Sequence, residues 1–179
     1  MYYSHRFASP IGPLLLASNG SDLVGLWMEG QKYFGRTVNE PLEPDAQRRE
    51  FTHASTWLDA YFAGKNPALD DLPLAPQGSA FQQAVWQQLL RIPYGETTTY
   101  GAIARQVAEQ MNKTSMAGQA VGSAVGHNPI SIIIPCHRVV GGSGSLTGYA
   151  GGIQKKIRLL TLEGVNTARF SVPTKGTAL

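Results

Sequence analysis

The sequence predicts an α/β protein in two parts: strands followed by a helix at the N-terminus, then a mostly helical part with a helix-turn-helix. Three features support this prediction: short β-rich segments between turn signals, a segment rich in Pro, Asp and Gly at residues 65–79, and helical spacing of apolar residues beyond it. With 179 residues, 42% of them hydrophobic, the chain can bury the core of one large or two small domains.

The first part should open with three strands. The segments YYSHRFA, GPLLLAS and DLVGLWM are rich in β-forming residues and separated by Ser-Pro and Asn-Gly-Ser turn signals, which predicts a small antiparallel sheet. A helix ending at Gly64 should follow, and residues 65–79 then form a linker or covering loop that holds the domain boundary. The apolar face of that helix comprises Phe51, Ala54, Leu58, Tyr61 and Phe62.

Helices dominate the second part. Ser79, followed three residues later by Gln82, fits a capping box and opens a core helix. The segment YGAIARQVAEQM has one apolar helical face, and MAGQAVGSAVGHNP follows it after the polar turn NKTS. Two short helices joined by a turn predict a helix-turn-helix.

The second helix of this pair carries glycine at every fourth position. Each of Gly118, Gly122 and Gly126 weakens a helix by up to ~1 kcal/mol, so something should come close to that face. One explanation is tight packing on a neighbouring helix or strand. The other is entry into a DNA minor groove, which is only about 6 Å wide. The residues alone leave both open.

The only cysteine, Cys136, follows Pro135 and precedes His137 and Arg138. We expect residues 130–134 before it to be a buried extended run. A single cysteine excludes an internal disulfide and a thiolate-rich zinc cluster, and neither a metal nor a cofactor is expected. Cys136 is either a small buried hydrophobe or a nucleophile, and its basic neighbours favour the nucleophile because they stabilise a thiolate.

The last predicted helix, IQKKIRLLTLEG, places Glu163 on its apolar face just before a C-cap glycine, Gly164. A carboxylate there meets the negative end of the helix dipole and, if buried, needs a partner. A frayed, solvated helix end is one explanation. Pairing with His137 is the other, and the logic of catalytic triads favours it.

The charge is uneven along the chain. Residues 1–79 hold 6 Lys/Arg and 9 Asp/Glu (net −3), whereas residues 80–179 hold 9 and 3 (net +6). The basic half fits a nucleic-acid partner but does not establish one. The N-terminus lacks a signal-peptide pattern, and no apolar run reaches the ~20 residues of a membrane span, so we expect a cytoplasmic protein without membrane contact.

Four segments, PCHRVVG, AVGSAVGHNPISIII, GSLTGYAGG and LLTLEG, resemble the O6-alkylguanine-DNA alkyltransferases. The resemblance is specific over residues 79–164 and general before them, in SPIGPLLLAS and LDAYFAG. It implies an α/β domain like ribonuclease H at residues 1–76 and a DNA-binding and alkyl-transfer domain at residues 77–166. That second domain would be mostly helical and winged-helix-like, and residues 167–179 would form a tail.

The activity that the resemblance implies is direct DNA repair with a single turnover. The Cys136 thiolate would take the alkyl group from O6-alkylguanine, with O4-alkylthymine as an open second substrate, and keep it because a thioether has no easily displaced group. A monomer would approach double-stranded DNA from the minor groove. The lesion would be rotated out of the stack at a cost of a few kcal/mol.

The resemblance also implies roles for individual residues. His137 would take the thiol proton through a water, Glu163 would hold His137, Asn128 would brace the helix-turn-helix, and Tyr100 would donate to the departing guanine. The base pocket would comprise Val125, Val139, Tyr149, Ala150 and Gly151. The DNA-binding residues would be Gln119, Ala120, Gly122, Ser123 and Arg138, with Lys155 and Lys156 as further candidate backbone contacts.

Blander explanations stay open for some of these residues. Tyr100 also fits a core residue at a helix start, residues 141–152 a mobile surface loop, and the two lysines solvated charge. Two features depart from the family pattern: Gln119 stands where an arginine is usual, and the join AEQMNKTSM is longer.

Three rival function classes fit less well. A non-catalytic lesion-binding module would lack the acceptor thiol, and a cysteine hydrolase needs a signature that is absent around Cys136. A transcription factor would need base-reading side chains where this helix offers Gly and Ala. DNA alkyl transfer is therefore the expected function.

Overall fold

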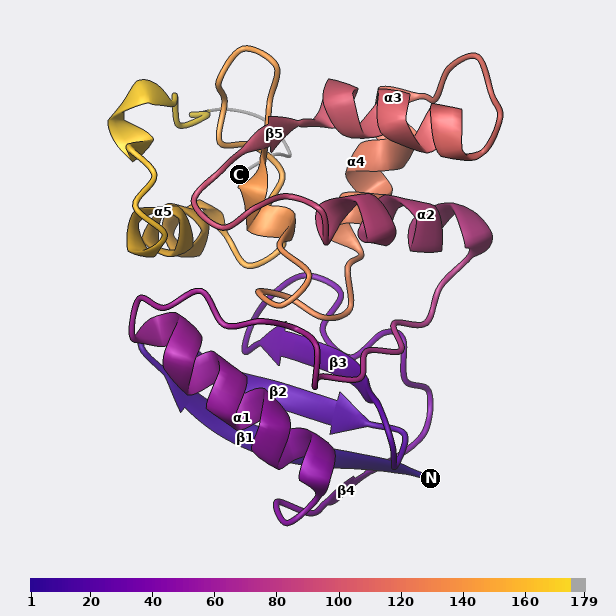
Figure 1. The fold of residues 1–179 in the computed structure, drawn as a ribbon, viewed down its shortest axis with the longest axis vertical. Helices are drawn as coiled ribbons and strands as arrows, with labels where there is room; N and C mark the ends of the chain where they lie inside the picture. Colours follow the sequence, from indigo (N-terminus) through magenta and orange to yellow (C-terminus); the bar gives the residue numbers. More distant parts are fainter. Residues whose placement is uncertain (175–179) are drawn as a thin grey trace. The chain divides into compact units, whose positions relative to one another are not determined.

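The computed structural model describes residues 1–174, and the chain forms two compact units (Figure 1). The N-terminal unit comprises Met1–Gln77 together with Pro129–Ser131. The C-terminal unit comprises Gly78–Asn128 and the residues from Ile132 onward. The predicted α/β class is confirmed, with a sheet in the first unit and mostly helices in the second.

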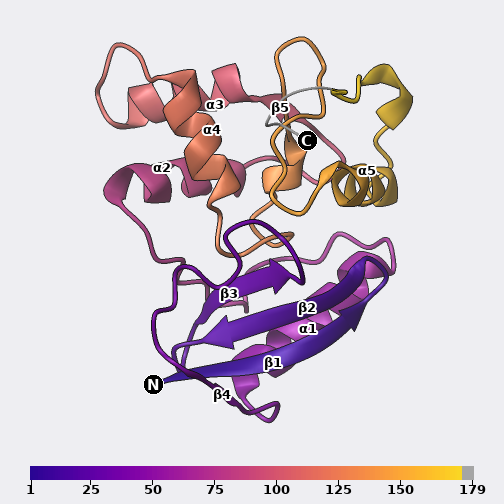
Figure 2. The same ribbon diagram turned by 180° about the vertical axis from the view of Figure 1, so that it is seen from behind.

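The N-terminal unit contains a four-stranded sheet of order β3-β2-β1-β4. The three predicted strands, β1 (Tyr2–Ser9), β2 (Gly12–Ser18) and β3 (Leu23–Met28), pair antiparallel as expected. The short β4 (Leu42–Pro44), which the sequence pattern did not indicate, pairs parallel with β1. Helix α1 (Arg49–Phe62) lies against one face of this sheet, in front of it in Figure 1 and behind it in Figure 2.

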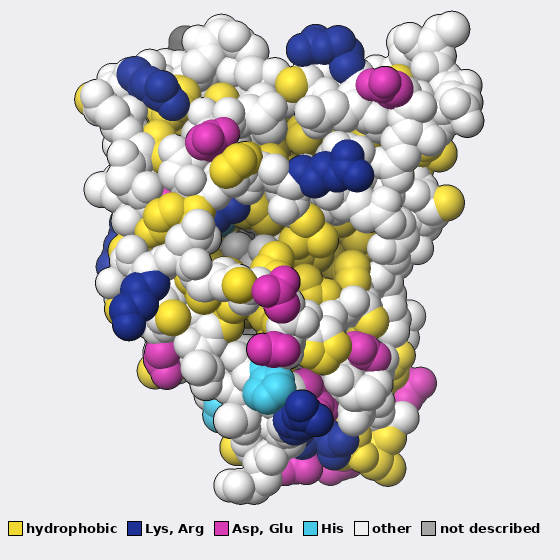
Figure 3. All heavy atoms as spheres, viewed as in Figure 1, with side chains coloured by type: hydrophobic (Ala, Val, Ile, Leu, Met, Phe, Trp, Pro, Cys, Tyr) yellow, Lys and Arg dark blue, Asp and Glu magenta, His cyan; other side chains and the backbone are white. Residues whose placement is uncertain are grey.

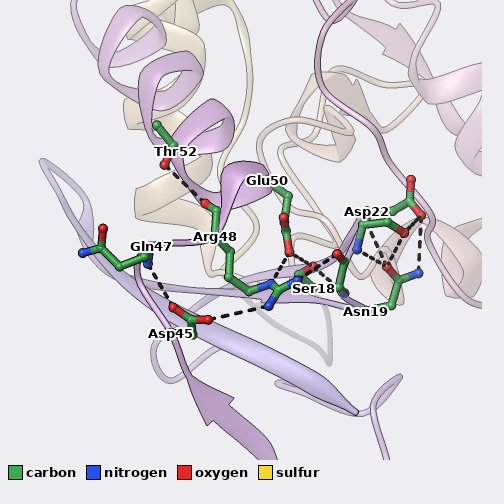
Figure 4. A network of polar contacts seen from close by, with 10 residues as sticks. Ser18, Asn19, Asp22, Asp45, Gln47, Arg48, Glu50 and Thr52 are labelled. Atoms are coloured by element: carbon green, nitrogen blue, oxygen red, sulfur yellow. Dashed lines mark hydrogen bonds and ion pairs between the residues drawn. The ribbon is translucent and has the colours of Figure 1, made fainter.

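The first turn of α1 is anchored to the sheet by a buried carboxylate (Figure 4). Ser18 Oγ donates to Glu50 Oε1 at 2.5 Å, and Arg48 Nε donates to the same oxygen at 2.7 Å. Arg48 also donates to the Gly20 carbonyl and stacks over the Tyr3 ring. Burial alone would raise the pKa of Glu50, but the hydrogen bonds from Ser18 and Arg48 outweigh it and lower that pKa.

The segment after α1 covers the edge of β3. Leu23 N donates to Pro73 O at 2.9 Å and Ala75 N donates to Leu23 O at 2.9 Å, while Leu72 is buried. The sequence allowed a linker or a covering loop, and the structure shows a covering segment.

Within residues 1–174, the C-terminal unit contains four α-helices: α2 (Ala80–Leu89), α3 (Tyr100–Gln110), α4 (Gly118–Gly126) and α5 (Ile153–Leu162). The predicted capping box at the start of α2 is present, because Ser79 Oγ accepts from Gln82 N and Gln82 Oε1 accepts from Ser79 N. Trp86 Nε1 on α2 donates to Ala124 O on α4 at 2.9 Å. These contacts fix the helices that frame the site.

Short elements complete this unit. Strand β5 (Thr98–Thr99) pairs parallel with β6 (Val139–Val140), directly after the 3-10 turn η1 (Cys136–Arg138). A second 3-10 turn, η2 (Thr167–Arg169), leads to Ser171, whose carbonyl accepts from Leu146 N at 2.8 Å. Of the predicted tail at residues 167–179, the last five lie outside the described residues.

One local prediction is wrong. Residues 130–134 are buried as expected, but they form a bridge and a turn rather than an extended run, and Ile132 has a φ of 72°. Only the first part of this run bonds like a strand: Leu26 N donates to Pro129 O at 2.8 Å and Ser131 N donates to Leu26 O at 2.9 Å. The apolar pattern predicted burial correctly, but a buried turn has the same apolar pattern as a buried strand. No helix within residues 1–174 is long and apolar enough to cross a membrane.

Candidate active site

Cys136 begins the turn η1 and is buried, with 5% of its surface exposed. Burial raises the pKa of its thiol. Three features oppose that rise: a hydrogen bond from the Asn128 side chain, the positive charge of Lys156, and the backbone N–H groups of Cys136 and His137. The sequence left the geometry around Cys136 open, and the 3-10 turn supplies the irregular backbone that an extended chain lacks.

Asn128 connects the end of α4 to the cysteine turn. Its Nδ2 donates to Ile134 O at 2.8 Å, and its backbone N–H donates to Val125 O at 3.3 Å. The same side chain bonds to the thiol of Cys136. One buried amide therefore fixes both the segment before the cysteine and the cysteine side chain.

His137 pairs with Glu163, as the sequence predicted. His137 Nε2 and Glu163 Oε2 are 2.5 Å apart, and both side chains are fully buried. Glu163 Oε1 also accepts from Arg138 Nε at 2.7 Å and from Gly95 N at 3.1 Å. A carboxylate that accepts three hydrogen bonds is ionised. Nε2 of His137 therefore carries the proton, and Nδ1 is the basic nitrogen of the ring.

Burial lowers the pKa of His137, and the charges of Arg138 and Lys156 lower it further against the opposing effect of Glu163. The imidazole is therefore neutral near pH 7 and can accept a proton. This is the state that a general base requires.

Arg138 does not lie where a DNA-backbone contact was expected. Its side chain is 10% exposed, its Nε binds Glu163, and its Nη1 donates to Ile92 O at 2.7 Å. A guanidinium held by a buried carboxylate and a carbonyl is not available to a phosphate. Arg138 instead supports the carboxylate that holds His137.

Lys156 also differs from its expected place on the surface. It is completely buried, and its Nζ donates to Val139 O at 2.6 Å and to Thr147 O at 3.0 Å. Its neighbour Lys155 is half-buried.

Tyr100 lies at the start of α3 and its hydroxyl donates to Thr147 O at 3.0 Å. Burial raises the pKa of Tyr100, and the negative charge of a Cys136 thiolate raises it further. The hydroxyl therefore stays protonated at neutral pH and can donate a hydrogen bond. It must leave the carbonyl of Thr147 to serve a base.

The loop at residues 141–152 is held at several points rather than loose. Leu146 is buried in a cluster with Val140, Leu160 and Val165, and the carbonyl of Thr147 accepts two side-chain bonds. Of the expected base-pocket residues, three are buried and two are half-buried: Val125, Val139 and Tyr149, then Ala150 and Gly151. Burial raises the pKa of the Tyr149 phenol, as do the charges of Cys136 and Glu163.

Helix α4 turns its predicted DNA-binding residues outward. Gln119, Ala120 and Ser123 are exposed and Gly122 is half-buried. A Cβ built on Gly118 or on Gly122 would meet no atom within 4 Å. Internal packing therefore does not explain these two glycines, which leaves the approach of another molecule.

Over the C-terminal unit, in the upper part of Figure 3, Lys and Arg side chains are separated by uncharged and acidic side chains rather than gathered in one patch. On that face the basic charge is spread out. Within residues 1–174 no three His, Cys, Asp or Glu side chains lie close enough together to hold a metal ion.

Two family models match the chain. The 6-O-methylguanine DNA methyltransferase, DNA binding domain, matches residues 80–165, and the ribonuclease-like domain of the same family matches residues 1–76. A Mycobacterium tuberculosis protein named methylated-DNA–protein-cysteine methyltransferase is 48% identical over 91% of this chain and 93% of its own length. The chain belongs to the 6-O-methylguanine DNA methyltransferase family.

Further relatives agree. A Methanosarcina acetivorans methylated-DNA–protein-cysteine methyltransferase is 46% identical over 92% of this chain and 99% of its own. The crystal structure of Mycobacterium tuberculosis OGT in complex with DNA has a TM-score of 0.76 and 48% identity, with 94% of each chain covered. An O6-methylguanine DNA methyltransferase from Methanococcus jannaschii has a TM-score of 0.59 and 27% identity, covering 98% of this chain and 99% of that one.

Sequence reasoning missed one residue of this methyltransferase site, Thr147, and assigned another, Lys156, only a candidate contact to the DNA backbone. Thr147 acts through its carbonyl, which no sequence pattern reveals. Lys156 was detectable, because it lies three residues after Ile153 and four before Leu160, on the buried face of α5 that also carries Glu163. A charged residue on an apolar helical face indicates a buried partner, and this signal applied to Lys156 as it did to Glu163.

Proposed function

We propose that this protein repairs DNA directly, by moving the alkyl group of O6-alkylguanine onto Sγ of Cys136 in a single turnover. The observation that carries this proposal is the buried turn in which the only cysteine of the chain adjoins a neutral histidine fixed by a buried carboxylate. That turn lies within the part of the chain that matches the DNA-binding domain of the family.

The chemistry follows from the fixed protonation of His137. With Nε2–H held by Glu163, Nδ1 accepts the proton of the Cys136 thiol through a water, and Asn128 and Lys156 stabilise the thiolate. The sulfur attacks the alkyl carbon, an S–C bond forms, and the O6–C bond breaks. Its electron pair passes to the guanine, which Tyr100 can protonate or hydrogen-bond.

The step is irreversible because the product is a thioether. A thioether sulfur is a poor leaving group and holds no proton for a base to remove, so nothing at neutral pH restores the thiol. The protein is then consumed with its substrate.

We further propose that a monomer binds the minor groove through the outward face of α4. The small residues at Gly118, Ala120 and Gly122 allow a close approach to the groove floor. Since Cys136 is 5% exposed, the lesion has to leave the stack to reach it. The flipped base would enter between Val125, Val139 and the segment at residues 149–151.

The experiment that tests this function is mass measurement of the protein after incubation with duplex DNA that carries one O6-methylguanine. We expect a gain of one methyl group per protein, located on the Cys136 peptide, together with repaired guanine and no second turnover. Cys136→Ala should bind the duplex and gain no mass. A parallel duplex with O4-methylthymine reports whether the pocket accepts that base.

Binding of the lesion without any gain of mass by the unmodified protein would contradict the proposal. It would identify a lesion sensor instead. Methylation at another residue would equally overturn the role given to Cys136.

A further inference from the structure

Within residues 1–174, one ammonium group of the C-terminal unit is buried, and its charge acts on the Cys136 thiol. None of the surface of Lys156 is exposed, and its Nζ donates to Val139 O at 2.6 Å and to Thr147 O at 3.0 Å. Burying a cation is costly unless opposite charge or several acceptors compensate it. The two carbonyls provide part of that compensation.

The rest of the compensation does not come from a carboxylate. Among residues 1–174 no Asp or Glu forms an ion pair with Lys156, whereas the other buried cation of the site, Arg138, is paired with Glu163 at 2.7 Å. Burial lowers the pKa of Lys156 to about 8, and negative charge on Cys136 raises it. The thiolate of Cys136 is thus an anion whose charge acts on this lysine, and it exists only when Cys136 is ready to react.

The two carbonyls connect Lys156 to two parts of the site whose relative position matters: the segment that holds Cys136 and the loop of the expected base pocket. Val139 directly follows the turn that holds Cys136, and Thr147 belongs to the loop of the expected base pocket. The carbonyl of Thr147 also accepts from the Tyr100 hydroxyl. One side chain from α5 therefore joins the thiol segment, the pocket loop and, through a shared acceptor, the start of α3.

We propose that Lys156 is a positioning residue of alkyl transfer, whose ammonium supplies positive charge for the Cys136 thiolate and holds the pocket loop beside it. This inference rests on the proposed function for its relevance to repair. Its electrostatic part concerns the thiol alone and is testable without DNA.

Other ionisable groups also lie near the charge of Lys156, and their titration has to be distinguished from that of Cys136 and Lys156. His137 lies on the same turn as Cys136 and its pKa is lowered by Lys156, while the Tyr100 phenol shares the Thr147 carbonyl. Both tyrosines near the thiol, Tyr100 and Tyr149, have a raised pKa and stay protonated through the neutral range. Through the neutral range the charge changes of the site thus belong to Cys136 and Lys156, while His137 is neutral.

The test is a titration of the thiolate by its ultraviolet absorbance, which reports on Cys136 because it is the only cysteine. Cys136→Ser serves as the blank. In Lys156→Met, which keeps most of the length of the side chain and removes its charge, the midpoint should move up by about one pH unit. The rate of methyl transfer from O6-methylguanine duplex at pH 7.5 should fall at least ~10-fold, since about one unit of pKa is tenfold in thiolate.

Two further variants make the result decisive. Lys156→Arg keeps the charge and should hold the thiolate midpoint near that of the unmodified protein even if its bulk slows transfer. Lys32→Met removes one exposed lysine from the N-terminal unit and should change neither the midpoint nor the rate. If Lys156→Met does not fold, Lys156→Gln takes its place, because it also removes the charge while its amide can still donate to a carbonyl, and its midpoint is compared with those of Lys156→Arg and Lys32→Met.

An unchanged thiolate midpoint in Lys156→Met would overturn the electrostatic role, and a transfer rate lowered equally at every pH would then indicate packing alone. A shifted midpoint in a protein that never gains a methyl group would support the role of Lys156 and sink the proposed repair function. The two proposals therefore fail separately.

Discussion

The buried charged side chains of the C-terminal unit differ in function because they differ in partner. Glu163 accepts from His137, Arg138 and a backbone N–H, which makes it the fixed anion of the site. Lys156 has two carbonyls instead. The first arrangement sets which histidine nitrogen is basic, and the second leaves positive charge for the thiolate. Both follow from the rule that a buried charge needs a partner.

The lowered pKa of His137 makes stability depend on pH. In the unfolded chain this imidazole titrates near 6.5, whereas burial lowers its pKa in the folded protein. Below pH ~6.5 the unfolded state therefore binds the extra proton, and stability falls as pH falls from there toward the lower folded pKa. Between pH 7 and 5.5 the free energy of unfolding should fall by about 1 kcal/mol more than in His137→Gln.

Urea denaturation of both proteins at several pH values measures this difference. The other titrating groups are common to the two proteins and cancel in the comparison. Parallel stability curves would show that His137 accepts a proton as easily when folded as when unfolded.

At the scale of elements, α4 contains two glycines that lower its helical stability and that its packing does not require. Gly118 and Gly122 have space for a methyl group, and neither has a backbone conformation that needs glycine. Alanine at either position would favour the helix by up to ~1 kcal/mol. A protein that keeps glycine there gains something other than stability from it, and a close approach to DNA is the explanation that its function offers.

Gly122→Ala separates these two effects. We expect the free energy of unfolding to rise by about 0.5–1 kcal/mol. Methyl transfer from an O6-methylguanine duplex should slow by roughly tenfold, because an added methyl in a tight contact costs about 1–3 kcal/mol. Transfer from the free O6-alkylguanine base should be unchanged, and it is the internal control. Equal rates on duplex DNA would mean that this face does not enter the groove.

Helix positions were predictable from the sequence because their signals are local. The capping box at Ser79 and the apolar face from Phe51 to Tyr61 each depend on residues within a few turns. The turn at Ile132 was not predictable, because burial of a short apolar run does not fix its backbone. The place of Arg138 depends on Glu163, 25 residues away. The charge of Arg138 alone favoured a position on the surface. Its partner Glu163 comes close only in the folded chain.

At the scale of the whole molecule, the side chains of the site belong to one unit. Tyr100, Asn128, Cys136, Lys156 and Glu163 all lie in the C-terminal unit, with the catalytic segment interrupted only at Pro129–Ser131. The N-terminal unit has a buried charged network of its own at the start of α1. The division predicts that stability and chemistry respond separately to substitutions in the first unit.

Glu50→Gln tests this separation. The substitution removes the charge that Arg48 and Ser18 share, and leaves Arg48 with the Asp45 carboxylate, the Gly20 carbonyl and the Tyr3 ring. Because the carboxylate is 5% exposed, its loss should lower the free energy of unfolding by about 2–3 kcal/mol. The rate of methyl transfer per folded molecule should be unchanged, since no reacting group lies in that unit.

Urea denaturation measures the first quantity, and single-turnover transfer at 25 °C, normalised to the protein that can be methylated, measures the second. Glu43→Gln, an exposed position on β4, is the matched control and should leave both unchanged. A transfer rate that falls with Glu50→Gln while the protein remains folded would show that the chemistry depends on the N-terminal unit. A stability that does not fall would mean that the Ser18 and Arg48 contacts offset no more than the cost of burying the carboxylate.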